Sequence, residues 1–285
     1  MKKKGIVIVR VWEGLGNQLF QYAYARALQL RSIENVKLYV LPDQGDRTVR
    51  DYKLDRLKIT IPRARMFEKI AVFIERYEIV KKIVQYITER VGFIGYMEED
   101  DVKYKEELKY LTGNYYLSGW FQNEKYFEEF AEIIRKEIRP RKKIKISTEL
   151  KDILEHKNTV SVHIRRGDFA RYSNILDKEY YYKAFEVMEE HIDDIFYVVF
   201  SDELDWVMEN MQFGDNVYYV NKDKKLEDFE ELFIMSHCKH HIIANSTFSW
   251  WGAWLNINEE KIIIGPEKWF FGRKRNIMPD NWIRI

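Results

Sequence analysis

Hydrophobic and polar positions follow two different periods along the chain, which predicts both strands and helices. Near the N-terminus, a β-rich run from Gly5 to Trp12 precedes a glycine turn at Gly14–Asn17. Apolar residues then recur at helical spacing from Leu19 to Leu30. Residues 36–41 predict the next strand, which Pro42 ends. The chain is therefore expected to begin as strand, tight turn, helix and strand.

A long amphipathic stretch from Met66 to Ile87 carries Lys and Arg between its apolar positions. It predicts one or two helices packed on a sheet. The alternative is a helix that lies on an anionic membrane surface, because basic amphipathic helices also bind lipid. Residues 115–118 then predict a strand, and residues 123–138 predict a helix that ends before Pro140.

Regular alternation begins after a basic segment, Arg139–Lys145, whose proline marks it as a domain boundary. Strands separated by short helices predict a parallel, doubly wound sheet with helices on both faces. The expected fold class is α/β, with domains at residues 1–140 and 141–285. In the second domain, strands are expected at residues 160–164, 195–200, 217–220, 241–244 and 262–264, and helices at residues 178–191, 203–211, 226–237 and 248–255.

Composition narrows the class of protein. The chain of 285 residues has 47 basic and 46 acidic side chains, and its net charge of +1 argues against a nucleic-acid binder held by bulk electrostatics. The single cysteine, Cys238, excludes an internal disulfide and favours a reducing, cytoplasmic location. The apolar run behind the basic N-terminus is too short for a signal peptide. Polar residues within the longest uncharged segment, 242–258, argue against a membrane span.

Candidate ligand-binding residues follow three predicted strands. Arg165 and Arg166 follow one strand, Asp202 and Glu203 follow the next, and a polar run opens a helix after a third. Because the carboxyl ends of parallel strands meet at one edge of a sheet, we expect these groups to lie together. Paired guanidiniums can hold a pyrophosphate without a metal ion, and a helix start offers further donors to phosphate. The run consists of Asn245, Ser246, Thr247, Phe248 and Ser249.

Each of these features has a structural alternative. The arginine pair can form surface salt bridges at a strand end, and Ser246, Thr247 and Asp202 can simply cap helices. Their convergence at one edge favours a phosphate-bearing ligand. A carboxylate at Asp202 or Glu203 can also accept the N1–H and N2–H donors of guanine, which favours guanine over adenine.

The N-terminal glycine turn matches known phosphate-binding loops only in part. Leu19 occupies the place of the third glycine of a dinucleotide fingerprint, and no phosphate-loop lysine follows. Glycines still let the backbone approach a ligand closely, so Gly16 and Asn17 are candidate contacts at a cleft between the domains. A tight turn capped by Asn17 is the alternative.

Several motifs together resemble the bacterial α-1,2-fucosyltransferases, and the resemblance extends over nearly the whole chain. It is carried by Gly14–Ala23, Tyr116–Gln122 with Lys125–Phe127, His163–Asp168, Ser201–Asp202, Asn245–Leu255 and Pro266–Phe270. The resemblance implies a GT-B-like architecture, in which two Rossmann-type domains face each other across a cleft. Residues 1–140 would then bind the acceptor, and residues 141–285 would bind GDP-β-L-fucose.

The same resemblance implies an inverting enzyme that moves L-fucose to the 2-hydroxyl of a terminal galactose-type residue without a metal or other cofactor. No Asp-x-Asp motif occurs in the chain, so Arg165 and Arg166 are the expected stabilisers of the departing GDP. The resemblance places His163 near the guanosine and leaves open whether Asp202 or Glu203 reads the base. Asp168 is the candidate general base, or it braces one arginine.

Other side-chain clusters have mainly structural interpretations. His237, Cys238, His240 and His241 straddle a predicted helix end and a strand, so no metal site is expected there. The spacing of Trp250, Trp251 and Trp254 predicts core packing. By contrast, the resemblance suggests Trp120 and Phe121 as a platform for a sugar.

The expected partners are GDP-fucose and a galactose-containing oligosaccharide or lipid-linked glycan, with no nucleic acid. Peripheral association with the cytoplasmic face of the inner membrane is compatible with this interpretation. A fucosyltransferase of different linkage and a non-catalytic nucleotide-sugar or carbohydrate-binding protein are the alternatives. Only turnover and the linkage of the product separate these three functions.

Overall fold

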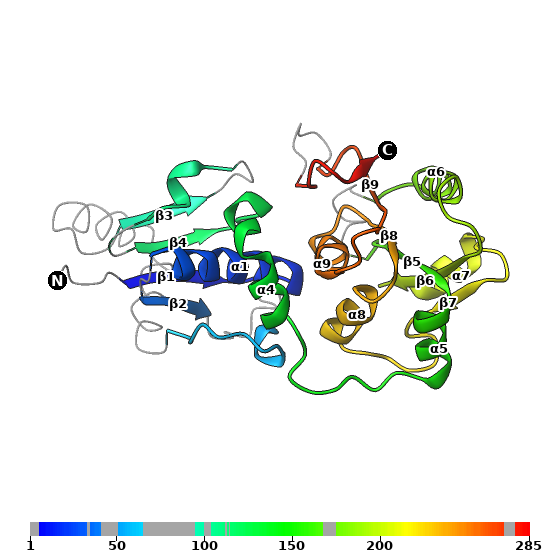
Figure 1. Ribbon diagram of the computed structural model, residues 1–285, viewed down its shortest axis with the longest axis horizontal. Coiled ribbons are helices and arrows are strands. Elements are labelled where there is room, and N and C mark those ends of the chain that lie inside the picture. The colour runs from blue at the N-terminus through cyan, green and yellow to red at the C-terminus, as the bar shows by residue number, and fades with distance from the viewer. Residues whose placement is uncertain are drawn as a thin grey trace. The chain divides into compact units, whose positions relative to one another are not determined.

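The computed structural model describes residues 6–32, 35–40, 51–64, 95–99, 104–111, 113, 115–167, 175–270 and 277–285. The chain divides into two compact units, Met1–Arg139 and Pro140–Ile285, which are described separately (Figure 1). The division falls within the basic segment that contains Pro140. The amphipathic stretch at residues 66–87 and the candidate base Asp168 lie outside the described residues.

In the described part of the N-terminal unit, four parallel strands form a sheet in the order β2-β1-β4-β3. The strands are β1 (Ile6–Val11), β2 (Asn35–Val40), β3 (Gly95–Glu99) and β4 (Tyr115–Gly119). Strand β3 was not predicted, because its sequence of Gly, Tyr, Met and two Glu lacks an apolar alternation. Helix α1 (Leu15–Ser32) connects β1 to β2. It begins four residues earlier than predicted, so Gly16 and Asn17 lie in its first turn rather than in a separate loop.

The predicted helix at residues 123–138 is wrong in its first half. Two 3-10 turns, η4 (Glu124–Tyr126) and η5 (Glu128–Phe130), precede the short helix α4 (Ala131–Glu137). Phe127 between them has φ −144°, which interrupts the helical path. Among the described residues of this unit, the other 3-10 turns are η1 (Leu54–Arg56) and η3 (Glu106–Leu108).

In the described part of the C-terminal unit, six parallel strands form a sheet in the order β10-β9-β8-β5-β6-β7. This is the strand order of a Rossmann-type doubly wound sheet. The strands are β5 (Asn158–Ile164), β6 (Ile195–Ser201), β7 (Val217–Tyr219), β8 (His240–Ile242), β9 (Ile263–Gly265) and β10 (Ile283–Arg284). The helices are α5 (Thr148–His156), α6 (Lys178–Glu189), α7 (Leu204–Asn210), α8 (Asp228–Met235) and α9 (Thr247–Leu255). The sequence predictions missed α5 and β10.

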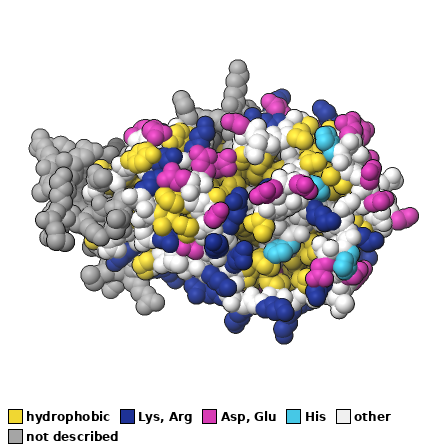
Figure 2. All heavy atoms as spheres, viewed as in Figure 1, with side chains coloured by type: hydrophobic (Ala, Val, Ile, Leu, Met, Phe, Trp, Pro, Cys, Tyr) yellow, Lys and Arg dark blue, Asp and Glu magenta, His cyan; other side chains and the backbone are white. Residues whose placement is uncertain are grey.

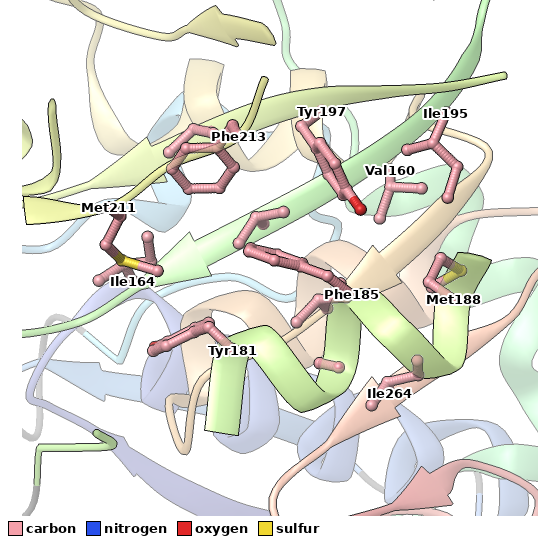
Figure 3. Close-up of a cluster of buried hydrophobic side chains, with 14 of the residues drawn as sticks. Val160, Ile164, Tyr181, Phe185, Met188, Ile195, Tyr197, Met211, Phe213 and Ile264 are labelled. Carbon is pink, nitrogen blue, oxygen red and sulfur yellow. The ribbon is translucent and has the colours of Figure 1, made fainter. Parts of the chain in front are cut away.

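Helices cover both faces of this sheet, and strand β6 shows how its sequence allows this. Tyr197 and Val199 pack in a cluster with Phe185 of α6 (Figure 3). The alternate residues Val198 and Phe200 pack in a second cluster that includes residues of α5 and α8. Successive strand side chains point to opposite faces, so a continuous apolar run is what a strand covered on both sides requires.

The tryptophans of α9 and the histidines of β8 are core residues. Trp250, Trp251 and Trp254 are at most 4% exposed, which confirms their predicted packing role. The His241 ring lies between Ser161 Oγ, 2.7 Å from its Nδ1, and Asn256 Nδ2, 2.7 Å from its Nε2. Burial lowers the pKa of His241 to about 3, so the ring is neutral. Within the described ranges, no group of three or more His, Cys, Asp or Glu side chains is placed to hold a metal ion.

Charges of both signs are interspersed on the face of the molecule shown in Figure 2. This matches the near-neutral balance of the sequence. Among the helices that the structure describes, none has the length and apolarity to cross a membrane.

Candidate functional site

The C-terminal sheet reverses its strand order between β5 and β8, with β6 and β7 on one side and β9 and β10 on the other. Open α/β sheets bind ligands at such a reversal, beyond the carboxyl ends of the strands. The register pairs Ile164 with Ser201 and Val162 with Ile242. The residues that follow β5, β6 and β8 therefore start at one edge, as the sequence predicted.

Carboxylates that follow β6 hold both arginines. Nη1 of Arg165 lies 3.0 Å from Oδ2 of Asp202, and Nε of Arg166 lies 3.1 Å from Oε2 of Glu203. The backbone N–H of Arg166 also donates to Oδ1 of Asp202 at 3.0 Å. The arginines therefore do form salt bridges at the strand end, as the structural alternative predicted. Asp202 does not cap a helix, because Glu203 occupies the N-cap position of α7. A guanidinium carries five N–H donors, so one carboxylate does not exhaust its capacity for anions.

Gly167 lets the arginine turn approach Asp202. A Cβ atom at this position would lie 2.6 Å from Oδ2 of Asp202, which is closer than real Cβ contacts allow. The arginines, Gly167 and Asp202 therefore form one tightly packed corner. Asp168 comes next in the chain, and its role as general base or brace stays a prediction.

Trp206 is a residue of this corner that the sequence analysis missed. The guanidinium carbon of Arg166 lies 3.3 Å from the centroid of the Trp206 ring, within the first turn of α7. A cation–π contact of this kind fixes the plane of the guanidinium and attracts its charge. The sequence feature that could have indicated Trp206 is its position, because it lies three residues after Glu203 in the helix that follows β6.

His163 is a buried, neutral ring next to the arginines. It is 4% exposed, and its ring centroid lies 5.5 Å from that of Phe248 in α9. Burial, and to a lesser extent the charge of Arg165, lower the pKa of His163 to about 3. Its Nδ1 atom is buried without a hydrogen-bond partner in the described part of the chain. A ring with this pKa is a poor base, but as a neutral imidazole it can donate or accept a hydrogen bond with a ligand.

The start of α9 contains both a helix cap and surface donors. Ser246 occupies the N-cap position, and its hydroxyl accepts a 3.4 Å hydrogen bond from the backbone N–H of Phe248. The cap alternative therefore applies to Ser246. Thr247 and Phe248 are partly exposed, so this first turn can present backbone N–H groups and the Thr247 hydroxyl to an anion.

The two flanking polar residues of that segment are turned inward. Ser249 is fully buried, and its hydroxyl donates to the carbonyls of Ala244 and Ser246 at 3.4 and 3.2 Å. Asn245 is 4% exposed, and its Nδ2 donates to the Trp269 carbonyl at 3.4 Å. We expect these two residues to shape the turn rather than to carry the phosphate.

Glu231 of α8 is a second residue that the sequence analysis missed. Burial, together with the charges of Asp228 and Asp202, raises its pKa to about 7, although Asn221 donates to its Oε1 at 2.7 Å. A carboxylate with a raised pKa near a ligand-binding corner is a functional candidate. No motif in the sequence marked it, because the shift arises from burial.

Amide side chains dominate the corresponding strand ends of the N-terminal unit. Nε2 of Gln122 donates to Oδ1 of Asn17 at 2.9 Å, which joins the end of β4 to the first turn of α1. Gln21 accepts from the backbone N–H of Trp12 at 3.0 Å and donates to the Gly119 carbonyl at 3.2 Å. These glutamine contacts fix the ends of β1 and β4 side by side. Whether Gly16 and Asn17 contact a nucleotide stays a prediction.

The predicted sugar platform at Trp120 and Phe121 is wrong for Phe121. That ring is 1% exposed and stacks on Tyr24 with a centroid distance of 4.0 Å, so it belongs to the core. Trp120 is partly exposed and contacts Trp12 instead, with a centroid distance of 4.4 Å.

The structure thus defines an α/β protein of two units with parallel sheets, and in the C-terminal unit two arginines and a helix start follow the strands at the point where the strand order reverses. The family model described as Glycosyl transferase family 11 matches residues 2–285. The chain belongs to this family and is therefore a glycosyltransferase.

The chain is similar to two proteins of Escherichia coli over nearly their whole lengths. It is 32% identical to the O-antigen biosynthesis glycosyltransferase WbnK, over 95% of this chain and 98% of the relative. It is 30% identical to an alpha-1,2-colitosyltransferase, over 98% of this chain and 99% of the relative. The family-level resemblance read from the sequence is thereby confirmed.

The structure of Arabidopsis thaliana FUT1 in complex with GDP matches with a TM-score of 0.51 and 10% identity, over 92% of this chain and 70% of that chain. The likeness concerns the fold alone and confirms the predicted GT-B-like α/β class. The arrangement of two domains across a cleft stays a prediction.

Proposed function

We propose that the protein transfers L-fucose from GDP-β-L-fucose to the 2-hydroxyl of a terminal galactose-type residue of a glycan, with inversion and without a metal ion. The observation that carries the proposal is the corner at the reversal of the C-terminal sheet. There Arg165 and Arg166 are fixed by Asp202, Glu203 and Trp206, at the same edge as the start of α9.

The arginines match the charge that develops in such a reaction. As the bond between fucose and the diphosphate stretches, negative charge grows on the departing GDP oxygen and positive charge grows on the sugar ring. Guanidiniums held in place by ion pairs need little reorganisation to stabilise that oxygen, so they lower the barrier to departure. The acceptor hydroxyl attacks the opposite face of the anomeric carbon, loses its proton to a base, and the configuration inverts. Asp168 is the proposed base.

Asp202 is the proposed positioning residue of the site. Its Oδ2 forms an ion pair with Arg165 and lies next to Gly167, and its Oδ1 accepts a hydrogen bond from the backbone N–H of Arg166, so both oxygens are already engaged. Glu203 has a 42% exposed side chain and is the better placed of the two carboxylates to accept the guanine N1–H and N2–H donors. Neutral His163 would face the same nucleoside as a hydrogen-bonding ring.

A second donor deserves equal testing because the 30%-identical relative is named as a colitosyltransferase. Colitose is fucose without its 3-hydroxyl, so both GDP sugars present the same diphosphate to the arginines. Parallel assays with GDP-fucose and GDP-colitose at equal concentrations would decide the donor. A higher kcat/KM with GDP-colitose would replace fucose in the proposal and leave the role of the arginines intact.

The test of the proposed function uses the purified full chain, GDP-fucose, a β-galactoside acceptor and excess chelator. We expect GDP release that depends on the acceptor and a product that NMR identifies as fucosylated at the 2-hydroxyl. Transfer to another hydroxyl would contradict the linkage. Donor binding without turnover would indicate the non-catalytic alternative, and activity that returns only with manganese would contradict metal independence.

The proposed setting is the cytoplasmic side of the inner membrane, with a lipid-linked glycan as acceptor. Two features support it: Cys238, the single cysteine, and the similarity to a protein named for O-antigen biosynthesis. Co-sedimentation of the protein with vesicles that carry such a glycan would test the membrane association.

A further inference from the structure

In the N-terminal sheet, β1 and β4 are neighbouring central strands, and a tryptophan follows each of these strands. Trp12 comes directly after β1, and Trp120 comes directly after β4. The parallel register pairs Val9 with Leu117, so three residues further along the two tryptophans are level with each other. Their ring centroids lie 4.4 Å apart with an interplanar angle of 38°. At this separation the two indoles lie partly face to face, so Trp12 packs against one face of Trp120 at the carboxyl ends of the two strands.

This pair differs from most tryptophans of the chain. All eight lie in the described part of the protein, and five of them are at most 8% exposed and serve the core of the C-terminal unit. Trp12, Trp120 and Trp206 are the partly exposed members. Trp206 supports Arg166 in the C-terminal unit, so its exposure has a separate explanation.

Surrounding contacts hold the indole pair rigidly. The guanidinium carbon of Arg10 lies 4.7 Å from the centroid of the Trp12 ring, and its Nη1 lies 3.4 Å from Oγ of Ser118. Gln21 fixes the backbone at Trp12 and at Gly119 in the same turn. A preorganised aromatic surface loses little conformational entropy when a ligand stacks on it.

The polar groups nearby suit a neutral ligand with many hydroxyls. Asn17 and Gln122, which follow the same two strands, provide amide donors and acceptors and are joined by their own hydrogen bond. Nε1 of Trp12 is buried without a hydrogen-bond partner among the described residues. Buried donors are usually hydrogen-bonded, so this N–H is a candidate to bind a ligand. Amides and indole N–H groups recognise hydroxyls, whereas the guanidiniums of the other unit recognise phosphate.

We propose that Trp120, with Trp12 packed against it, forms the stacking platform for the acceptor sugar, a galactose-type pyranose. The axial 4-hydroxyl of galactose leaves the hydrogens of C3, C4 and C5 on one apolar face, which can lie flat on the indole of Trp120. Asn17 and Gln122 bind hydroxyls at the rim of that ring. This inference rests on the proposed function for the identity of the sugar, and it assigns a binding site within the N-terminal unit alone.

The test compares Trp120→Ala and Trp120→Phe with Tyr110→Ala, which removes a 62% exposed aromatic ring elsewhere in the same unit. We expect Trp120→Ala to raise the KM for the β-galactoside about tenfold or more, because the stacking surface is lost. The KM for GDP-fucose and the acceptor-independent release of GDP should stay within twofold. Trp120→Phe should keep most acceptor affinity, and Tyr110→Ala should match the wild type.

Saturation-transfer NMR with methyl β-galactoside measures the same site without turnover. We expect the sugar C–H signals to respond to the wild-type protein and to vanish with Trp120→Ala. An acceptor KM within twofold of wild type in Trp120→Ala, or an equal loss in a folded Trp120→Phe variant, would overturn the platform. If the wild type transfers no fucose but the NMR response persists and depends on Trp120, the proposed function fails while the sugar site stands.

Discussion

The two sheets of this protein are both parallel in the part of the chain that the structure describes, yet different kinds of side chain follow the central strands of each sheet. In the C-terminal unit the strand ends carry Arg165, Arg166, Asp202 and Glu203, all joined by ion pairs. In the N-terminal unit the strand ends carry tryptophans and amides. In the proposed reaction, the strand ends of the C-terminal unit would bind the charged leaving group, and those of the N-terminal unit would bind the neutral acceptor sugar. On this proposal the side chains that follow the strands, rather than the fold class, distinguish the two roles.

The largest effect should come from the charged side of this comparison. Arg165→Ala removes a preorganised donor to the leaving diphosphate and should lower kcat by about 100-fold or more, or ~3 kcal/mol. Steady-state assays of GDP release measure this loss. Lys151→Ala is a suitable control, because it breaks an exposed ion pair with Glu155 in the same unit and should leave kcat unchanged. Near-normal turnover of a folded Arg165→Ala protein would contradict the role of Arg165.

The corner around Asp202 should be the next most sensitive. Gly167→Ala forces a Cβ atom against Oδ2 of Asp202, and Asp202→Asn removes the charge that holds Arg165. Both should lower kcat about tenfold, because each displaces the same guanidinium. Glu203→Gln keeps the shape of its side chain and should act mainly on the KM for GDP-fucose. Equal kcat losses in Glu203→Gln and Asp202→Asn would show that the two carboxylates have the same role.

Trp206 sharpens the contrast between the two units, because it is a partly exposed tryptophan of the C-terminal unit. Trp206→Leu removes the surface under Arg166 and should weaken GDP binding about fivefold, or ~1 kcal/mol. Isothermal titration calorimetry with GDP measures the change. The acceptor KM should stay unchanged, which is the reverse of the result expected for Trp120→Ala. If Trp206→Leu changed the acceptor KM and left GDP binding unchanged, the proposed division of roles between the two units would be contradicted.

The last effect concerns stability and pH rather than the reaction. Burial lowers the pKa of His241 to about 3, so between pH 3 and its ordinary value near 6.5 the unfolded chain binds a proton that the folded chain does not. The free energy of unfolding should therefore fall as pH drops below 6.5, by at most about 1.4 kcal/mol per pH unit from this residue.

Urea unfolding between pH 5 and 7 measures this slope. His241→Gln should flatten the slope even if it lowers stability overall, because Ser161 and Asn256 lose their partner. His156→Gln is the matched control, because it removes a 67% exposed histidine of the same unit. An unchanged slope in His241→Gln would show that the buried ring does not control this pH dependence.

Much of the fold could be predicted from periodicity alone, because the C-terminal strands are apolar runs bounded by polar ends. The exceptions have physical causes. Strand β3 has no apolar alternation, and the residues before α4 form 3-10 turns where helical spacing suggested a longer helix. In each case the local sequence has only a weak preference for one type of secondary structure, and tertiary contacts determine which type forms.

The candidate site was predictable only where a residue follows a strand directly. Arg165, Asp202 and Ser246 meet at one edge because strand ends do, and the sequence reveals strand ends. The stacking of Trp206 on Arg166 and the raised pKa of Glu231 depend on distances and burial that exist only in the folded chain. Phe121 shows the converse, because an aromatic residue in a suggestive motif packs into the core.

A crystal structure of the protein with GDP, grown in the presence of a chelator, tests the central claim most directly. We predict that oxygens of the diphosphate lie within hydrogen-bond distance of the Arg165 or Arg166 guanidinium, beyond the end of β5. A diphosphate bound away from both side chains would contradict the account.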